Sequence, residues 1–225
     1  MSRVASKSSE TSGSEWSLDS IEHLVLDGVS WELYEHLLKV VGNRPLRLTY
    51  DQGELEIMSP LPEHEDAKIA IGSFVRAIVE ELDLPCRGLG STTFRRRLKK
   101  RGLEPDDCFY IKSQPKVVGK KRLNLPKDPP PDLVVEIDIT SRVIPRLPIY
   151  VSLEVPEIWR YDGRNLHCLL LQNGDYIGSD YSLAFPKLRV SELRPFIRIA
   201  EEKSDQTAAV KALRAWLRKQ SWIQR

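Results

Sequence analysis

The stretch Pro129-Pro130-Pro131-Asp132-Leu133-Val134-Val135-Glu136-Ile137-Asp138-Ile139-Thr140-Ser141 decides the fold of this chain. A short run of Leu, Val and Ile between prolines and a Thr-Ser pair is typical of a strand that is buried on both faces. Because side chains alternate along a strand, one face carries aliphatic residues only, and the other carries Asp132, Glu136 and Asp138 around Val134. We therefore predict a central buried strand with three carboxylates on one face.

This row of carboxylates has two interpretations. In a low-dielectric site the three groups cannot all stay ionised unless a cation joins them or some of them take up a proton. Mg²⁺ or Mn²⁺, which prefer oxygen ligands, would suit such a site. Alternatively, the strand shows a polar face to water, as strands of solvated sheets commonly do. The spacing alone leaves both interpretations open.

Composition limits the class of protein. With 225 residues, 41% of them hydrophobic, the chain can bury one good core. A net charge of +2 is too small to indicate nucleic-acid binding by itself. The three cysteines lack paired spacing, which argues against a disulfide framework or a zinc knuckle. No apolar run approaches the roughly 20 residues that span a bilayer, and the N-terminus lacks the apolar core of a signal peptide. We expect a soluble, cytoplasmic protein without membrane contact.

Three parts of the chain are expected. Residues 1–17 are rich in Ser and are predicted to be a disordered leader, residues 18–200 a single domain, and residues 201–225 a C-terminal amphipathic helix. Within the domain, periodicity predicts helices at 31–41, 63–82 and 191–200. Ser30 is expected to cap the first of them and Gly42 to end it. A further helix is expected at 207–220. Strands are expected at 46–50, 54–58, 102–111, 157–161, 166–171 and 176–177. The turn residues 51–53 predict that the first two form a hairpin. Trp159 is expected in the core.

The long helix begins with the acidic sequence Glu63-His64-Glu65-Asp66. Acidic residues commonly compensate the dipole at a helix N-terminus, which is the simpler interpretation. The functional interpretation is that one of them, Glu63, reaches a metal ion. His64 is expected to make a hydrogen bond or contact a phosphate rather than bind a metal, because no second His lies at a metal-binding offset.

Six cations occupy seven positions between Arg95 and Arg101. Such a run is usually a solvated face. It is also what a phosphodiester substrate requires beside a carboxylate site, because contacts to phosphate supply most non-specific affinity. The candidate nucleic-acid-binding residues are His64, Arg95, Arg96, Arg97, Lys99 and Lys100.

Three ordered motifs resemble one family. They are Glu-Pro-Asp-Asp-Cys-Phe-Tyr-Ile at 104–111, the stretch at 129–141, and Val-Pro-Glu-Ile-Trp-Arg-Tyr-Asp-Gly at 155–163. The lead-in Gly-Glu-Leu-Glu-Ile-Met-Ser-Pro, followed by Glu63-His64 on a helix, fits the same pattern. The chain resembles the Uma2 family of restriction-endonuclease-like proteins, within the PD-(D/E)XK nuclease superfamily, in the version abundant in cyanobacteria. The resemblance covers roughly residues 45–190.

The resemblance implies an α/β (α+β) fold with a PD-(D/E)XK restriction-endonuclease-like core, in which helices flank a central mixed sheet. It also implies an active site with an acid at the start of one strand and Glu-x-Lys on the next. By position, Asp106 is the first acid and Glu136 the second, with Glu63 as a weaker candidate for a helix acid. Asp132 opens a second Pro-Asp and could replace or supplement Asp106. Mg²⁺ or Mn²⁺ would be the cofactor, held by residues from the set Asp106, Glu136, Asp132 and Glu63.

The chain departs from this pattern at the lysine. Asp138 stands at the Glu-x-Lys position, and Arg146 stands where relatives carry a lysine in the following helix. Arginine can stabilise charge on a phosphate, but with a pKa above about 12 it cannot deprotonate water near neutral pH. The expected function is metal-dependent hydrolysis of DNA by a homodimer, with Asp106, Glu136, Asp138 and Arg146 as catalytic candidates. The alternatives are a DNA-binding protein with the same fold and little or no turnover, and a hydrolase for another phosphoester.

Overall fold

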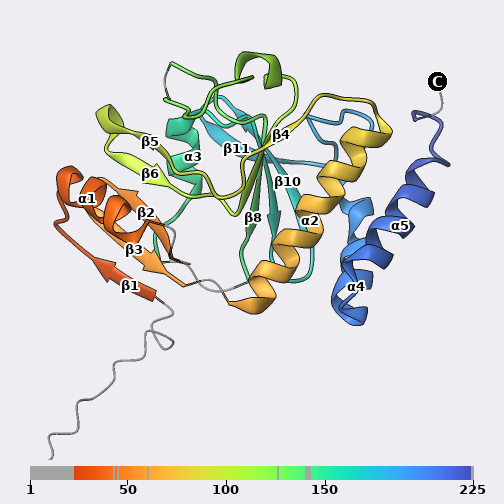
Figure 1. Ribbon diagram of the computed structural model, residues 1–225, viewed down its shortest axis with the longest axis horizontal. Coiled ribbons are helices and arrows are strands. Elements are labelled where there is room, and N and C mark those ends of the chain that lie inside the picture. The colour runs from red at the N-terminus through yellow and green to blue at the C-terminus, as the bar shows by residue number, and fades with distance from the viewer. Residues whose placement is uncertain are drawn as a thin grey trace, which may run out of the picture.

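The computed structural model describes residues 23–223, except residues 43, 45, 60, 126 and 140–142. The predicted leader at 1–17 lies outside the described residues. The chain forms a mixed α+β structure with two sheets (Figure 1). In the described part of the chain, none of the helices is both long enough and apolar enough to cross a bilayer.

The N-terminal sheet contains five strands in the order β1-β3-β2-β6-β5. Helix α1 (Trp31–Val41) begins at the predicted cap, where the Ser30 side chain accepts a hydrogen bond from the Leu33 N–H, and it ends at Gly42. The predicted hairpin is confirmed as β2 (Arg47–Asp51) and β3 (Glu54–Met58). The remaining strands are β1 (His23–Leu26), β5 (Phe94–Arg96) and β6 (Arg101–Leu103). The basic run therefore forms a β-hairpin, which the sequence analysis did not predict.

The larger sheet contains six strands in the order β11-β10-β9-β8-β7-β4. Only β8 and β9 are parallel among these neighbours, so the sheet is mixed, as expected. The strand predicted from 133 onward is β8 (Leu133–Ile137), and all five of its residues are buried. The other strands are β4 (Arg87–Gly88), β7 (Asp107–Tyr110), β9 (Glu157–Tyr161), β10 (Leu166–Gln172) and β11 (Asp175–Ser179).

Helices cover both faces of this sheet. Helix α2 (Pro62–Glu81) lies across one face, together with α4 (Arg194–Lys203) and α5 (Gln206–Leu217), and the short helix α3 (Leu147–Leu153) covers the other (Figure 1). Short 3₁₀ turns lie at Arg97–Lys99, Gln114–Lys116 and Val190–Leu193.

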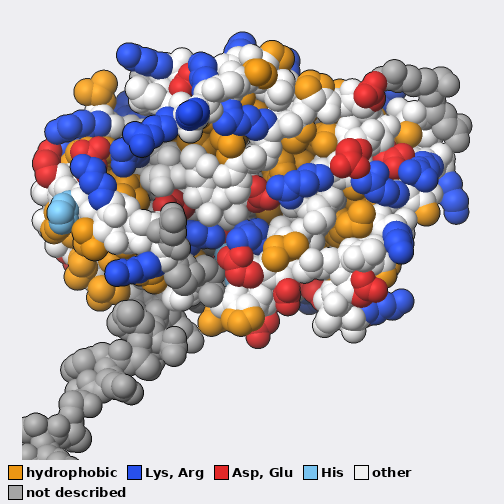
Figure 2. All heavy atoms as spheres, viewed as in Figure 1, with side chains coloured by type: hydrophobic (Ala, Val, Ile, Leu, Met, Phe, Trp, Pro, Cys, Tyr) orange, Lys and Arg blue, Asp and Glu red, His pale blue; other side chains and the backbone are white. Residues whose placement is uncertain are grey.

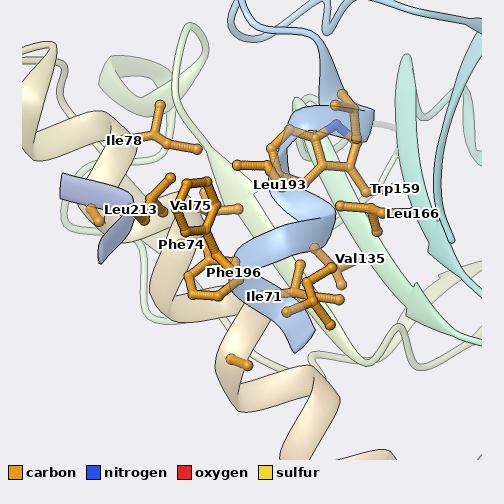
Figure 3. Close-up of a cluster of buried hydrophobic side chains, with 14 of the residues drawn as sticks. Ile71, Phe74, Val75, Ile78, Val135, Trp159, Leu166, Leu193, Phe196 and Leu213 are labelled. Carbon is orange, nitrogen blue, oxygen red and sulfur yellow. The ribbon is translucent and has the colours of Figure 1, made fainter. Parts of the chain in front are cut away.

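The alternation of side chains along β8 separates two cores. Val135 packs with Ile71 and Phe74 of α2 and with Phe196 of α4 (Figure 3). Val134 instead joins the cluster that contains residues of α3. Trp159 is fully buried beside Phe185, which confirms its predicted place in the core. Glu136 has the same parity as Val134 and therefore lies on the α3 face, where the site is found.

Candidate functional site

The strand register places the two predicted acids opposite each other. Asp107 of β7 pairs with Val135 of β8 in an antiparallel ladder. Continuing this register by one residue sets Asp106 opposite Glu136. Glu136 is in turn the register partner of Arg160 on the parallel strand β9. Three neighbouring strands thus contribute Asp106, Glu136 and Arg160 to one row across the sheet.

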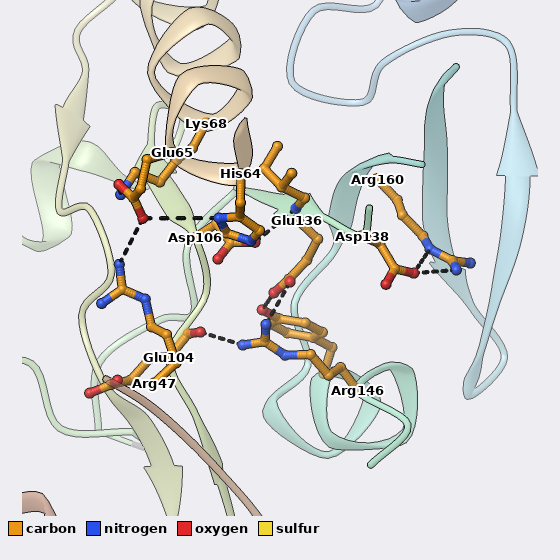
Figure 4. Close-up of polar contacts among 12 residues, drawn as sticks. Arg47, His64, Glu65, Lys68, Glu104, Asp106, Glu136, Asp138, Arg146 and Arg160 are labelled. Carbon is orange, nitrogen blue, oxygen red and sulfur yellow. Dashed lines mark hydrogen bonds and ion pairs between the residues drawn. The ribbon is translucent and has the colours of Figure 1, made fainter. Parts of the chain in front are cut away.

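Glu136 is enclosed by two residues from the segment that enters and forms α3. Arg146 donates from Nη1 to Glu136 Oε2 over 2.7 Å (Figure 4). The hydroxyl of Tyr150 donates to Oε1. The second amino group of Arg146 donates to the backbone carbonyl of Glu104. Both oxygens of Glu136 are therefore engaged, and only 5% of the residue is exposed.

Asp106 is held from two sides. Its Oδ2 accepts a hydrogen bond from the Ile137 N–H over 2.8 Å and lies 3.3 Å from Nε2 of His64. His64 comes from the first turn of α2, which brings that helix terminus against the end of the sheet (Figure 4). Asp106 and His64 are each 1% exposed. The site is therefore a closed polar cluster at the junction of α2, β7 and β8.

Burial and charge set the protonation of these groups. Desolvation, reinforced by the negative charge of Asp106, raises the pKa of Glu136 to about 8, although Arg146 and Tyr150 act in the opposite direction. Burial also favours neutral Asp106, but the hydrogen bond and charge of His64 outweigh it and lower the Asp106 pKa. Burial likewise opposes a charged His64, yet Asp106 outweighs that effect and raises the His64 pKa. The structure thus pushes the pKa values of its two acids apart, a pattern that is common at functional sites.

The structure does not bring two predicted residues into this cluster. Asp132 lies four residues before Glu136, roughly 13 Å along the strand, and its Oδ2 accepts hydrogen bonds from the Ile111 N–H and from both N–H and Oγ of Ser113. Glu63 lines a separate cavity together with Asp66. The acidic residue of α2 nearest the cluster is Glu65, whose Oε1 lies 3.9 Å from Nδ1 of His64 and 3.7 Å from Nη2 of Arg47.

Asp138 lies on the same face as Glu136 but pairs elsewhere. Its Oδ2 accepts a hydrogen bond from Nε of Arg160 over 2.8 Å and another from Nη2 (Figure 4). A cavity of about 680 Å³ opens beside this pair and reaches Glu136, Arg146 and Tyr150. Both Tyr150 and Arg160 were missed in the sequence analysis. Aligning the five-residue strands 133–137 and 157–161 as parallel neighbours would have indicated Arg160, whereas nothing in the spacing indicates Tyr150.

The cations of the basic run are largely tied to acids of neighbouring elements. Arg95 lies near Glu35 and Arg97 near Glu32 of α1, Arg96 pairs with Glu154 at the end of α3, and Arg101 pairs with Asp51 of β2. Leu98 at the hairpin tip is 96% exposed. In Figure 2, Lys and Arg side chains gather on the part of this face where Figure 1 shows β5 and β6. The hairpin is thus tied to α1, to β2 and to the end of α3, while its tip at residues 97–100 is exposed.

The side chains of the cluster include oxygen donors of the type that divalent cations prefer. Among the described residues, no group of three or more His, Cys, Asp or Glu side chains is placed to hold one ion. Mg²⁺, however, is commonly held by one or two carboxylates together with water and substrate phosphate. Asp106 and Glu136 fit such an ion in ligand type and charge. In the structure, the positive charge that Glu136 contacts is the guanidinium of Arg146.

Of the comparisons with known proteins, the match to a family model agrees with the motifs. No protein with a curated description matches the chain significantly. The chain is similar to a crystal structure described as "a putative nuclease belonging to DUF820" from Anabaena variabilis ATCC 29413, with 13% identity and a TM-score of 0.47. That alignment covers 84% of this chain and 98% of the other. The model of the Uma2 family, described as "Putative restriction endonuclease", matches residues 31–200, and the chain therefore belongs to the Uma2 family.

Proposed function

We propose that this protein is a DNA endonuclease that hydrolyses phosphodiester bonds with the help of Mg²⁺ or Mn²⁺. The observation that carries the proposal is the meeting of Asp106 and Glu136, separated by 136 − 106 = 30 positions in the chain, in one buried cluster on neighbouring strands. Two neighbouring acids with opposed pKa shifts, of which Glu136 lines a cavity, are what acid–base and metal-assisted chemistry require. Membership of the Uma2 family supports a nuclease and a DNA substrate.

The residues have distinct roles in this proposal. Asp106 and Glu136 would hold the cation, which would activate water and neutralise charge on the phosphate. His64 fixes Asp106 as an anion, since it lies 3.3 Å from its carboxylate. Arg146 keeps Glu136 in place and neutralises its charge when no metal does so. Tyr150 orients the other oxygen of Glu136.

Contacts with DNA outside the cluster belong to the basic hairpin. Arg97, Lys99 and Lys100 lie at its tip, where they can reach backbone phosphates. His64, which was also proposed for this role, is buried and contacts Asp106 instead, so its part is the positioning of that acid. A homodimer remains our proposal for cutting both strands of a duplex, because two-fold assemblies match the symmetry of duplex DNA.

A second function, DNA binding without turnover, is favoured by one specific observation. Arg146 and Tyr150 occupy both oxygens of Glu136, and the position of the motif lysine holds Asp138 in an ion pair with Arg160. A protein arranged in this way binds an anion more readily than it releases a carboxylate to a metal. This alternative predicts affinity for DNA with no cleavage under any metal condition.

Nicking of supercoiled plasmid separates the two functions. The wild type should nick DNA with Mg²⁺ or Mn²⁺ and stop on addition of EDTA, and Glu136→Gln should lose the activity while keeping its circular dichroism spectrum. Glu54→Gln, an exposed glutamate on β3, is the matched control and should cut like the wild type. Equal cleavage by Glu136→Gln and wild type would refute the assignment. Binding without cleavage would favour the second function, and turnover of a small phosphoester alone would indicate a different hydrolase.

A further inference from the structure

The cavity beside the cluster has two unlike walls. Ile144, Pro145, Leu147, Pro148 and Ile158 supply an apolar wall, while Glu136, Asp138, Arg146 and Arg160 supply charged groups. Its volume of about 680 Å³ lies within the range of cavities that bind small ligands, roughly 300–1,000 Å³. A nucleotide unit, with an apolar sugar edge and an anionic phosphate, has the matching chemistry.

The two arginines of this cavity differ in what they can offer a ligand. Arg146 is 7% exposed and uses both amino groups, one on Glu136 and the other on the carbonyl of Glu104. The Arg160 side chain is 46% exposed. Its hydrogen bonds to Asp138 come from Nε and Nη2, which leaves Nη1 outside this pair. Arg160 is thus the arginine that presents donors to the cavity.

The register explains why Arg160 lies at this point. Glu136 and Arg160 are direct partners across the parallel strands β8 and β9, and both face α3. Asp138, two residues beyond Glu136 on the same face, reaches across to the guanidinium of Arg160. Asp138, which stands at the lysine position of the Glu-x-Lys motif, is therefore paired with a cation of the next strand, Arg160 of β9.

Resting on the proposed nuclease function, we propose that Arg160 binds the phosphate of the nucleic-acid backbone in this cavity and supplies the positive charge that the missing Glu-x-Lys lysine would supply. The apolar wall from Ile144 to Pro148 receives the adjoining sugar. Arg146 remains the buried partner of Glu136 and does not contact the phosphate. The pair with Asp138 uses the edge of the Arg160 guanidinium formed by Nε and Nη2, so the phosphate would be bound through the edge formed by Nη1 and Nη2.

Binding and cleavage are measured separately on Arg160→Ala, Arg160→Lys and the control Arg198→Ala. Arg198 is an exposed arginine of α4 that is also ion-paired, with Glu202 at 2.7 Å. Binding of a fluorescein-labelled 20-base-pair duplex in EDTA is followed by anisotropy over a range of salt concentrations. Arg160→Ala should weaken binding about 10-fold and reduce the salt slope by about 1. Arg160→Lys keeps the charge but not the paired donors of the guanidinium, so it should keep the salt slope and weaken binding less than Arg160→Ala does. Arg198→Ala should stay within about 2-fold of the wild type. In parallel, inorganic phosphate is titrated while the arginine Nε–H signals are recorded by NMR, and the Arg160 signal should shift.

The possible results separate this inference from the nuclease itself. If the wild type binds the duplex or phosphate through Arg160 but never cuts, the nuclease proposal fails and the phosphate site stands. If Arg160→Ala binds and cuts like the wild type, the phosphate site is overturned while the nuclease stands. If Arg160→Ala leaves duplex binding unchanged and inorganic phosphate does not shift the Arg160 signal, the phosphate site is overturned whatever the cleavage result.

Discussion

Arg146 Nη1 and Glu136 Oε2 lie 2.7 Å apart in a site where both side chains are almost wholly buried. An ion pair in such a place is costly to break, because the remaining charge has neither water nor a partner. The same pair engages Glu136 Oε2, an oxygen that Mg²⁺ or Mn²⁺ would need as a ligand. Stability and activity therefore make opposite demands on Arg146.

Replacing Arg146 tests that conflict. Arg146→Lys cannot bridge Glu136 and the Glu104 carbonyl as a planar fork, so it should release Glu136 more easily and increase Mn²⁺-dependent nicking. Above about pH 8, where Glu136 is charged, Arg146→Ala should lower the free energy of unfolding by about 3–5 kcal/mol, because it leaves the Glu136 carboxylate buried without its cation. Urea unfolding and plasmid nicking are the measurements. Arg214→Lys, in an ion pair between α5 and α2, is the control and should change neither strongly. Unchanged or lower nicking by a folded Arg146→Lys variant contradicts the prediction.

The raised pKa of Glu136 predicts a pH dependence of stability. A carboxyl whose folded pKa is about 8 holds its proton more tightly than in the unfolded chain, so the stability that it contributes is complete at low pH and is lost as pH rises from about 5 to about 8. The loss should amount to a few kcal/mol. Glu136→Gln removes this dependence, whereas Asp106, with its lowered pKa, acts in the opposite direction in both proteins.

Urea unfolding of wild type and Glu136→Gln at several pH values measures this difference. The gap between the two proteins should change between pH 5 and pH 8 and then level off. Glu54→Gln, exposed on β3, should track the wild type at every pH. Parallel curves for wild type and Glu136→Gln would show that Glu136 does not titrate in this range.

The contact between Asp106 and His64 predicts a spectroscopic change. Burial lowers the pKa of His64, and the carboxylate of Asp106 more than offsets this effect. In Asp106→Asn the offset is lost, so the His64 pKa should fall below the ordinary value of about 6.5. NMR titration of the imidazole signals measures the shift, and the signals of His36 and His167 serve as internal references. An unchanged His64 titration would mean that Asp106 does not govern its charge.

Neutralising the hairpin tip should weaken DNA binding without affecting the fold. The triple variant Arg97→Ala, Lys99→Ala, Lys100→Ala should lower duplex affinity and reduce the salt slope by up to about 3, one for each lost phosphate contact. The control removes the same charge from the C-terminal part of the chain, at Lys203 of α4, Lys211 of α5 and Lys219 just after α5, which are all exposed. Equal loss in both triples would indicate a general effect of net charge rather than a binding surface.

The local pattern of the sequence was sufficient for much of the secondary structure. The alternation from Leu133 to Asp138 predicted a buried central strand, which β8 confirms. Glu136 lies within β8, whereas Asp132 and Asp138 flank it. Ser30 and Gly42 marked the ends of α1 because capping depends only on nearby backbone groups. The motifs predicted the family, which the match to residues 31–200 confirms. The division of the chain at residues 18 and 201 stays a prediction.

The sequence by itself determined which acids and cations the chain carries and which of them share a strand face, since these follow from residue type and from the period of a strand. Tertiary structure alone decided that Arg146 and Tyr150 enclose Glu136, that Asp132 supports a distant loop, and that Arg160 lies beside Glu136. The physical reason is that these contacts join residues far apart in the chain. They form because β8 pairs with β7 and β9 and because α3 packs on the sheet. Their partners depend on register and helix packing, which no local pattern encodes.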